Sequence, residues 1–340
     1  MKHPYNFCYR KLHYRMHLCQ AYCMNLIPKA TSSFFALITM ALLLHCLPAF
    51  AADKNARPVW TDSVKAAAED PDFLLQGEYV GDGVGIQVAA MGGGQFYVSR
   101  FAGGLPGAGW KRAAPNVEQL STAGVKEKVN GMKKVARKSP SLDAEPPAGS
   151  VILFGGKASD KVKGTVKDDL LWAGAQSTGE YGDFLLHLEF RLPYKPTSPL
   201  TSQDRGNSGI YLQNRYEVQV LDSFGLVYDR AQVKIPLKSD PKQWCGCFYK
   251  FKAADIPMCL PPLSWQTYDI EFKAPKFKEG KKVADARITV KHNGVTIHDE
   301  VALPKGTGAG GGRKEVPVGP IIFQGHGNPV AYRNVWLLPR

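Results

Sequence analysis

The feature that most constrains the fold is a two-residue alternation of apolar and polar side chains in the second half of the chain. In "DFLLHLEFR", Phe184, Leu186, Leu188 and Phe190 alternate with polar residues, which places them on one face of a β-strand. "WQTYDIEFKAP" repeats the pattern, and "ARITVKHNGVTIHDEVAL" reads as a hairpin around Asn293-Gly294. Long helical periodicity is absent. Many strands with one apolar face each predict two sheets packed face to face, an all-β sandwich.

The first 51 residues differ in composition from the rest. They contain the apolar run "SSFFALITMALLLHCLPAFA", which follows a basic region without acids and ends in Ala49-Phe50-Ala51. A short apolar core followed by small residues predicts a secretory signal peptide cleaved after Ala51, with residues 1–23 as an upstream extension. An uncleaved anchor helix is the alternative. We therefore expect a secreted or periplasmic protein with no membrane span in the mature chain.

Removal of this leader changes the charge. The chain has 43 Lys and Arg and 30 Asp and Glu, and the leader holds five of the basic residues and none of the acidic ones. The mature chain keeps 38 basic and 30 acidic residues, a net charge of +8. The basic residues are scattered or lie in short runs without interleaved aromatics, so no nucleic-acid partner is expected.

Three cysteines remain after cleavage, Cys245, Cys247 and Cys259, in a compartment that permits disulfides. An odd number predicts one bond and one free thiol, and zinc would need more ligands nearby. We favour a bond between Cys245 and Cys259, with Cys247–Cys259 as the alternative. The segment 224–263 that contains them is proline-rich and long for a loop, so we expect an ordered wall or lid over one sandwich face.

Two folded regions are expected after the leader. Residues 52–145 contain short strands separated by glycines, with a hairpin turn at Gly92-Gly93-Gly94, and predict a small β-rich accessory domain. They contain no catalytic constellation. The stretch "SPSLDAEPPAG" has the prolines and the irregular polarity of a linker. The regular strands of the sandwich then occupy residues 146–340.

A row of polar side chains stands out in the strand "RYEVQVLDS". Glu217 and Gln219 share one face of the strand, while Tyr216 and the two valines point to the core. Asp222 follows Gln219 by three positions, so it joins the row only if a bulge or the strand end turns it back.

The C-terminal motif "FQGHGNPVAYRN" has the same character. Gln324 and His326 share a parity, and Asn328-Pro329 turns the chain into the strand that carries Arg333. Two strand pairs thus each present amide and acid–base groups, which fits an active site and a carbohydrate-binding face equally well. The candidate contacts with a substrate are Tyr216, Gln219, Asp222, Gln324, Asn328 and Arg333.

Four segments, in this order, resemble the 3-keto-disaccharide hydrolase family: "GNSGIYLQNRYEVQVLDSFG", "PPLSWQTYDIEFKAP", "ARITVKHNGVTIHDEVALP" and "GPIIFQGHGNPVAYRNVWLLP". The resemblance covers residues 150–340 almost continuously. The front half is similar to the domain that precedes it in some planctomycete members. The resemblance implies a concanavalin-like jelly-roll sandwich that cleaves glycosides oxidised at C3 of the sugar, by hydrolysis or by 1,2-elimination and hydration.

With such a substrate the C3 ketone acidifies the hydrogen on C2, so one general base can remove it while the C1 substituent leaves. We expect Glu217 and His326 to form the proton-transfer pair, in either order. The hydroxyls or the developing oxyanion would be held by Gln219, Gln324 and Arg333.

The expected partner is an oxidised oligosaccharide or another oxidised glycoside. No cofactor is predicted, and a bound metal ion stays open because Glu217, Asp222 and His326 include possible ligands. The alternative function is that of a secreted, lectin-like protein that binds carbohydrate without cleaving it.

Overall fold

A computed structural model describes residues 57–227, 232–233 and 239–340. Residues 57–340 form one compact unit. The predicted signal peptide and its cleavage after Ala51 lie outside the described residues. Of the helices that the structure describes, none is long and apolar enough to cross a membrane.

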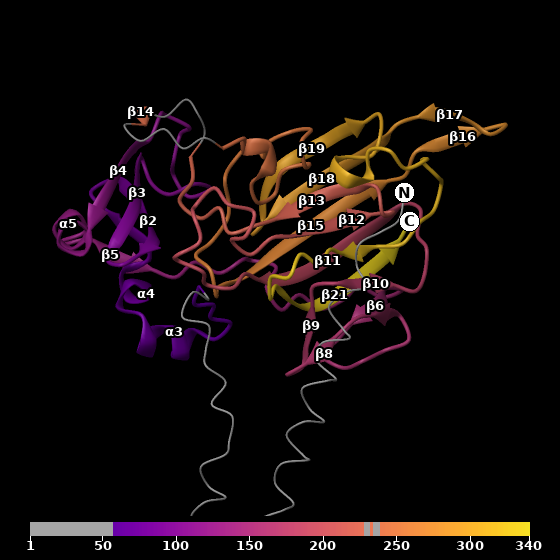
Figure 1. The fold of residues 1–340 in the computed structure, drawn as a ribbon. Coiled ribbons are helices and arrows are strands. Elements are labelled where there is room, and N and C mark those ends of the chain that lie inside the picture. The colour runs from indigo at the N-terminus through magenta and orange to yellow at the C-terminus, as the bar shows by residue number, and fades with distance from the viewer. Residues whose placement is uncertain (1–56, 228–231, 234–238) are drawn as a thin grey trace, which may run out of the picture. The chain divides into compact units, whose positions relative to one another are not determined.

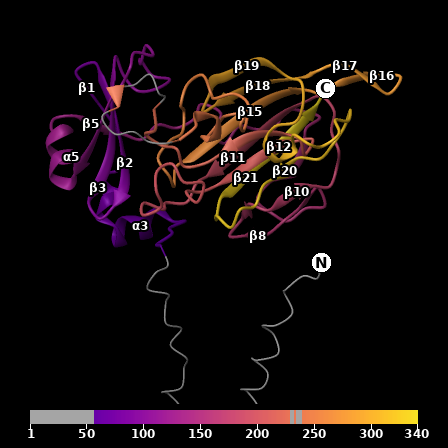
Figure 2. The same ribbon diagram turned by 45° about the horizontal axis from the view of Figure 1, so that its top comes forward.

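The sandwich consists of two antiparallel sheets, labelled in Figures 1 and 2. Among the described residues the larger sheet has eight strands: β19 (Val295–Leu303), β18 (Ala286–His292), β15 (Trp265–Lys273), β11 (Phe184–Arg191), β21 (Ala331–Pro339), β9 (Leu170–Trp172) and β8 (Val166–Lys167), with β6 (Val151–Phe154) also paired to β21. The smaller sheet has the order β13 (Tyr216–Val220), β12 (Ser208–Leu212), β20 (Ile322–Phe323), β10 (Ala175–Ser177) and β7 (Val162–Lys163). A separate hairpin joins β16 (Lys276–Lys278) to β17 (Lys281–Ala284). The predicted all-β, jelly-roll type of sandwich is confirmed.

The core lies between the facing sides of these two sheets. Phe184, Leu186, Leu188 and Phe190 are all buried there, as the alternation predicts. Rings also meet across the layers, for example Tyr216 and Phe272 with centroids 5.6 Å apart. Each fully buried side chain of this size contributes about 1.5–3 kcal/mol, so this interior accounts for much of the stability of the fold.

A third sheet, called the first sheet below, is built from the first part of the chain and one later strand. Its order is β14 (Gln232–Val233), β4 (Asn116–Ser121), β3 (Gln95–Ala102), β2 (Val84–Gly92), β1 (Gly77–Gly81) and β5 (Lys133–Val135). Helices α3 (Ser63–Glu69), α4 (Pro71–Leu75) and α5 (Thr122–Lys128) accompany it. The predicted hairpin turn is present, since Gly92 pairs with Gln95 and the two glycines between them have φ of 62° and 71°.

This first sheet is bound firmly to the sandwich. Arg205 donates from Nη2 to the carbonyl oxygen of Ala90 (3.0 Å), and the Ser99 hydroxyl donates to Gly225 O (2.7 Å). Trp60 and Tyr194 exchange both backbone hydrogen bonds. One apolar cluster therefore includes residues of both regions, so the two share part of their core.

The predicted linker is an ordered strap on the outer face of the larger sheet. The Ser139 and Ser141 hydroxyls bond to Thr267 Oγ1 at 2.6 and 3.0 Å, and Ser141 donates to Asp269 Oδ2 (2.6 Å). Because the strap covers this face, His187 and Glu189 are buried, although their alternation alone predicts an exposed side.

The described part of the segment 224–263 lies along the free edge of β13. Gly246 N donates to Gln219 O (2.9 Å), Gln219 N donates to Cys247 O (3.0 Å), and Phe248 forms an isolated bridge with Val218. Another part of the segment, β14, pairs with β4 in the first sheet. The described residues of the segment therefore lie next to the polar row as an added edge of the sheet rather than as a separate flap.

All three cysteines of this segment are buried free thiols. The structure thus differs from the predicted disulfide, but Cys245 and Cys259 share a side-chain hydrogen bond. The favoured pair is therefore in contact, and its oxidation stays a prediction. Cys245 Sγ also lies 3.2 Å from the Tyr268 hydroxyl.

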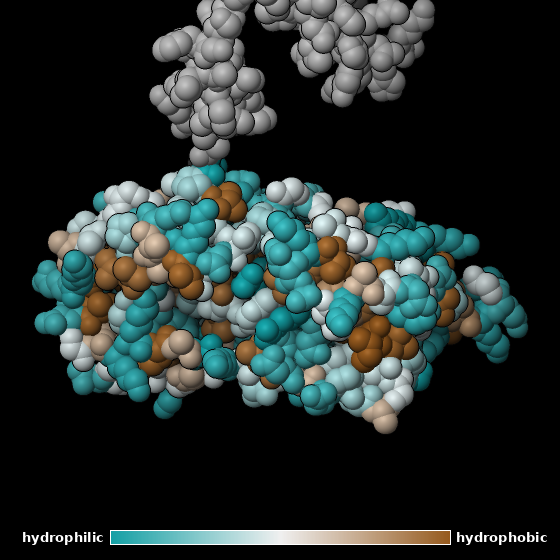
Figure 3. Space-filling model, turned by 90° about the horizontal axis from the view of Figure 1, so that it is seen from below, coloured by the Kyte–Doolittle hydropathy of each residue, from teal (hydrophilic) through white to brown (hydrophobic). Residues whose placement is uncertain are grey.

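Hydrophilic and hydrophobic residues are mixed on the face of the molecule that Figure 3 shows. On the face shown in Figure 3, apolar residues form separate patches between hydrophilic side chains. Large apolar side chains with high exposure include Val64, Leu74 and Val283. Single exposed apolar residues of this kind are normal for a folded protein and indicate no partner.

Candidate active site

The polar row lies on the outward face of the smaller sheet. Glu217 in β13 is paired in register with Tyr211 in β12, and Gln219 with Gly209. Tyr216 and the two valines of β13 belong to the core cluster, so the predicted division of this strand into two faces is confirmed.

The Glu217 carboxylate fits into a space that two glycines leave open. A Cβ atom on Gly209 would lie 2.4 Å from Oε1, and one on Gly308 would lie 2.7 Å from Oε2. Gly308 belongs to the short helix η2 (Gly308–Gly310), which lies beside β13 in the glycine-rich segment of residues 307–315. The same segment binds the strand through Thr307, whose hydroxyl accepts from Glu217 N at 2.8 Å. Larger residues at either glycine would displace the carboxylate.

Glu217 has few hydrogen-bond donors for a buried acid. Its side chain is 2% exposed, and the Tyr211 hydroxyl donates to Oε2 at 2.7 Å. Burial raises the pKa of Glu217 to about 7, against a smaller lowering by the Tyr211 hydrogen bond. A carboxyl with a pKa near neutrality can both take and give a proton at physiological pH.

Two amides lie next to this carboxylate. When the Gln219 amide is oriented with its nitrogen toward acceptors, Nε2 donates to Ser208 O (2.9 Å) and to Glu217 Oε1 (3.1 Å). Gln324 donates from Nε2 to the Tyr211 hydroxyl at 3.3 Å, and its buried Oε1 has no partner among the described residues. Glu217, Gln219 and Gln324 thus belong to one network, with Tyr211 at its centre.

His326 shares no hydrogen bond or ion pair with Glu217. Its side chain is exposed and forms no hydrogen bond or ion pair within residues 57–227 and 239–340. Asn328 fixes the turn that carries it: Nδ2 donates to His326 O (3.4 Å), and Oδ1 accepts from Lys195 Nζ (2.9 Å). The parity of Gln324 and His326 does not determine this position, because the chain leaves the strand at Phe323.

Asp222 and Tyr216, which the sequence predicts to contact a substrate, form no hydrogen bond with the Glu217 network. Asp222 is buried and forms an ion pair with Arg205 (2.7 Å), and its second oxygen accepts from Phe224 N (3.2 Å). Tyr216 turns inward, and its hydroxyl bonds to Glu315. Asp222 and Tyr216 thus support the fold beneath the site.

Arg333 lies on the other sheet. It donates from Nε to Glu189 Oε2 (2.7 Å) and from Nη2 to Asp143 Oδ1 (2.8 Å), and its guanidinium stacks on Trp265. These contacts fasten the strap to the outer face of the larger sheet. The structure therefore separates Arg333 from the residues with which the sequence groups it.

The sequence suggests Tyr211 only as one of several aromatics that suit a carbohydrate site and gives no role to Thr307, yet both contact Glu217. Tyr211 could have been found from the short turn in "YLQNRYE", because a tight hairpin there places Tyr211 opposite Glu217. Thr307 has no comparable signal, since it reaches β13 from a segment 90 residues away. Arg313, from the same segment, lies over the Tyr211 ring at 6.0 Å.

No metal site emerges from the described part of the chain. There, no three or more His, Cys, Asp or Glu side chains are grouped so that they could hold a metal ion. Glu217, Asp222 and His326 in particular do not form a ligand set, since Asp222 is enclosed with Arg205.

The smaller sheet of the sandwich thus brings together a buried carboxyl, a phenol and two amides, groups that are able to transfer protons and to form hydrogen bonds. The chain belongs to the family of 3-keto-alpha-glucoside-1,2-lyase-like domains, whose model matches residues 149–338. The predicted family is thereby confirmed. The prediction that the protein is a glycoside-cleaving enzyme is likewise confirmed at the level of the family.

Solved structures give more distant likenesses. A protein of Parabacteroides distasonis ATCC 8503 described as a candidate glycosyl hydrolase is 26% identical, with 64% of this chain and 98% of that chain covered and a TM-score of 0.48. A second structure with the same description and source is 18% identical over 56% and 94% of the two chains, with a TM-score of 0.39. Alginate lyase vAL-1 from Chlorella virus is 12% identical over 56% and 91%, with a TM-score of 0.26. No match was found among curated proteins.

Proposed function

We propose that the protein cleaves 3-keto glycosides by 1,2-elimination followed by hydration. The observation that carries this proposal is the buried Glu217, whose pKa is raised to about 7 and which has a single phenol as its hydroxyl donor. Membership in the 3-keto-alpha-glucoside-1,2-lyase-like family supports the choice of substrate.

The reaction needs one base and one proton donor. The ionised Glu217 takes the C2 proton, and the electron pair of that C–H bond enters the enolate formed with the C3 ketone. The ketone then re-forms as a C1–C2 double bond is made and the C1–O bond breaks, and the leaving oxygen takes a proton. Water afterwards adds its oxygen to C1, and C2 regains a proton, so elimination and hydration together equal hydrolysis.

The neighbouring groups suit the remaining tasks. Both N–H bonds of the Gln219 amide are used by Ser208 O and Glu217 Oε1, so Gln219 would orient the carboxylate. The Gln324 amide donates one N–H to Tyr211 and has a second one for a sugar hydroxyl or the enolate oxygen, and such a fixed donor stabilises developing charge without reorganisation. The proton donor to the leaving oxygen is either the Tyr211 hydroxyl, already bonded to Glu217, or the exposed imidazole of His326. Substitution of each residue distinguishes these two.

The direct test is incubation of the purified protein with 3-keto-trehalose or 3-keto-lactose, with products separated by chromatography. The keto sugars should be cleaved, and the unoxidised disaccharides should persist, because without the ketone the C2 hydrogen is not acidic. Equal rates on both would refute the elimination mechanism. Binding of both sugars with cleavage of neither would instead identify a carbohydrate-binding protein.

We further propose that the enzyme acts outside the cytoplasm, with residues 52–145 as an accessory domain. The basis is the leader sequence, so the mature chain should begin at Ala52. Mass spectrometry of the exported protein checks this, and an N-terminus that retains residues 24–51 would contradict it.

A further inference from the structure

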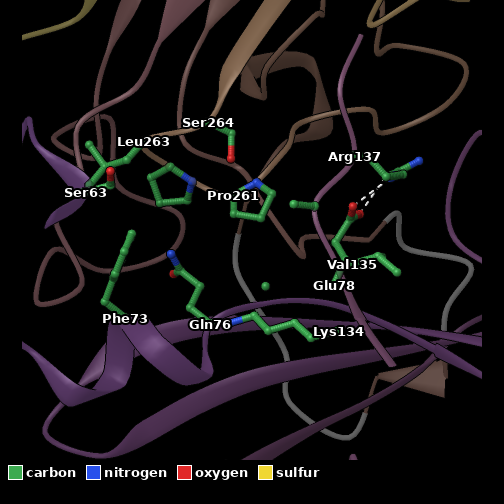
Figure 4. Close-up of a pocket in the computed structure, with 13 residues that line it drawn as sticks. Ser63, Phe73, Gln76, Glu78, Lys134, Val135, Arg137, Pro261, Leu263 and Ser264 are labelled. Carbon is green, nitrogen blue, oxygen red and sulfur yellow. Dashed lines mark hydrogen bonds and ion pairs between the residues drawn. The ribbon is translucent and has the colours of Figure 1, made fainter. Parts of the chain in front are cut away.

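A cavity of about 210 Å³ lies between the first sheet and the sandwich, apart from the Glu217 network (Figure 4). Its walls come from α3, α4, β1, β5 and the segment before β15. The residues that line it are Ser63, Phe73, Gln76, Gly77, Glu78, Lys134, Val135, Ala136, Arg137, Pro261, Pro262, Leu263 and Ser264.

One lining side chain has an unused donor. Gln76 is 4% exposed, and its Oε1 accepts from Ala90 N at 3.1 Å, which fixes the orientation of the amide. Its Nε2 has no partner among the described residues. Figure 4 shows the amide end pointing toward the wall formed by Pro261, Leu263 and Ser264. A buried N–H group without a partner costs free energy, because it has lost its hydrogen bonds to water. An acceptor that entered the cavity and bound this amide would recover that free energy.

The charged groups of the cavity are mostly neutralised. Arg137 donates from Nε and Nη2 to the two oxygens of Glu78, both at 2.6 Å, so this pair is closed. Lys134 donates to Leu74 O at 2.5 Å, and its ammonium group has further N–H bonds to offer. Ser63 and Ser264 add hydroxyls that form no hydrogen bond with the described residues. The cavity therefore offers donors and hydroxyls rather than an unpaired acid.

The lining also contains rings on two sides: Phe73 lies beside Gln76, and Pro261 lies across the cavity from both (Figure 4). Phe73, Pro261 and Pro262 present ring surfaces, with Leu263 beside them. The cavity is smaller than the roughly 300–1,000 Å³ pockets that hold drug-sized ligands. Its volume, ring surfaces and donors together match one sugar ring, whose C–H face is apolar and whose hydroxyls accept hydrogen bonds.

We propose that this cavity is a second carbohydrate site, which binds one neutral pyranose ring between the accessory region and the sandwich. The Gln76 and Lys134 donors would bind ring hydroxyls, and Phe73 with the prolines would cover the C–H face. Because both regions contribute walls, an occupied cavity would also hold them together.

The test is NMR titration of the whole mature chain with methyl α-D-glucopyranoside, followed at the backbone amides of Val135 and Ser264. These amides should shift and saturate with a Kd on the order of 1 mM, as expected for a ligand of this size. Gln76→Glu keeps the oxygen that binds Ala90 N and removes the donor, so it should weaken binding by about 3- to 10-fold. Gln119→Glu makes the same charge change at an exposed position of β4 and should bind like the wild type.

Glu217→Gln is the second control, since it alters the other site and should leave these shifts unchanged. No shift at Val135 and Ser264 in the wild type would overturn the proposal, as would equal binding by Gln76→Glu. Loss of the shifts in Glu217→Gln would assign them to the Glu217 site instead. Should Gln76→Glu fail to fold, Ser264→Ala removes a lining hydroxyl, and unweakened binding by that variant would count against the proposal.

Discussion

Glu217 and Glu189 are both buried carboxylates on the outward faces of the two sandwich sheets, yet their surroundings differ. Glu217 has the Tyr211 hydroxyl and the neighbouring Gln219 amide, and burial raises its pKa to about 7. For Glu189 the raising effect of burial is outweighed by polar partners, which lower its pKa to about 2. These partners are the imidazole of His187 (3.8 Å), Asn334 Nδ2 (3.0 Å), Asp143 N (2.6 Å) and Arg333 Nε (2.7 Å).

The comparison shows that burial alone does not identify a catalytic acid. Donors and a guanidinium hold Glu189 permanently ionised, so it cannot exchange a proton near neutral pH and acts as an anchor for the strap. Glu217 is buried almost as deeply but with fewer donors, which leaves its two protonation states close in free energy. The number of donors, rather than depth, separates the carboxyl for which we propose a reactive role from the structural one.

The largest expected effect is on turnover. Glu217→Gln should lower the rate on a 3-keto glycoside by about 10²–10⁴-fold, because a positioned base contributes that much. Glu189→Gln makes the same isosteric change on the other sheet and should retain turnover within a few fold. Steady-state kinetics on both variants measures this. A large loss in Glu189→Gln and a small one in Glu217→Gln would reverse the assignment of roles.

The same two variants should change the free energy of unfolding in opposite directions relative to the wild type. Because folding raises the pKa of Glu217, its contribution is complete below about pH 4.5 and is lost as the pH rises through about 7. Glu217→Gln should therefore be more stable than the wild type at pH 8, by up to about 3 kcal/mol. Urea unfolding at pH 5 and 8 tests this, and a gain of equal size at both pH values would show another cause.

The contribution of Glu189 to stability has the opposite pH dependence. Its pKa is depressed by folding, so its contribution is present above about pH 4.5 and is lost as the pH falls toward 2. Glu189→Gln should lose about 1–3 kcal/mol at pH 7, since it leaves buried donors without a full acceptor. The loss should shrink in urea unfolding at acidic pH. A loss that grows on acidification would contradict the described contacts.

A smaller effect is expected from the phenol. The rate should rise with pH around a midpoint near 7, as Glu217 ionises. Tyr211→Phe removes the hydrogen bond that lowers the pKa of Glu217, so the midpoint should move upward by roughly one pH unit. A pH–rate profile at saturating substrate measures the shift. His326→Ala should reduce the rate without this shift, and an identical shift in both variants would argue against a direct role of Tyr211.

The smallest effect concerns the strap. Ser141→Ala removes the hydroxyl that bonds to Asp269 and Thr267 and should cost about 1 kcal/mol of stability. Turnover should stay unchanged, because the strap lies on the sheet opposite to Glu217. Thermal unfolding together with an activity assay tests this prediction. A loss of activity would show that the outward face with Glu189 influences catalysis at Glu217, contrary to the separate roles assigned to the two faces.

The sequence determined those features that depend on one strand at a time. Alternation predicted the buried side of β11 and the shared face of Glu217 and Gln219, because side chains on a strand alternate strictly. It did not predict that Tyr211 lies against Glu217, which depends on the register between two strands. The tight turn in "YLQNRYE" would have indicated that register, whereas the position of the His326 side chain could not be predicted, since a glycine-rich turn has no periodicity that would position its side chains.

The buried guanidinium of Arg205 limits how freely this enzyme could be rearranged. It pairs with Asp222 beneath β13 and also donates to carbonyls of residues 195, 196 and 198 and to Ala90 in the first sheet. A chain that starts at residue 146 would leave one of these N–H groups without its acceptor and expose apolar residues such as Phe224 that lie in the shared core. We therefore expect that the sandwich is not stable as an independent domain without the first sheet. In recombination between relatives, the first sheet and the sandwich would have to be exchanged together.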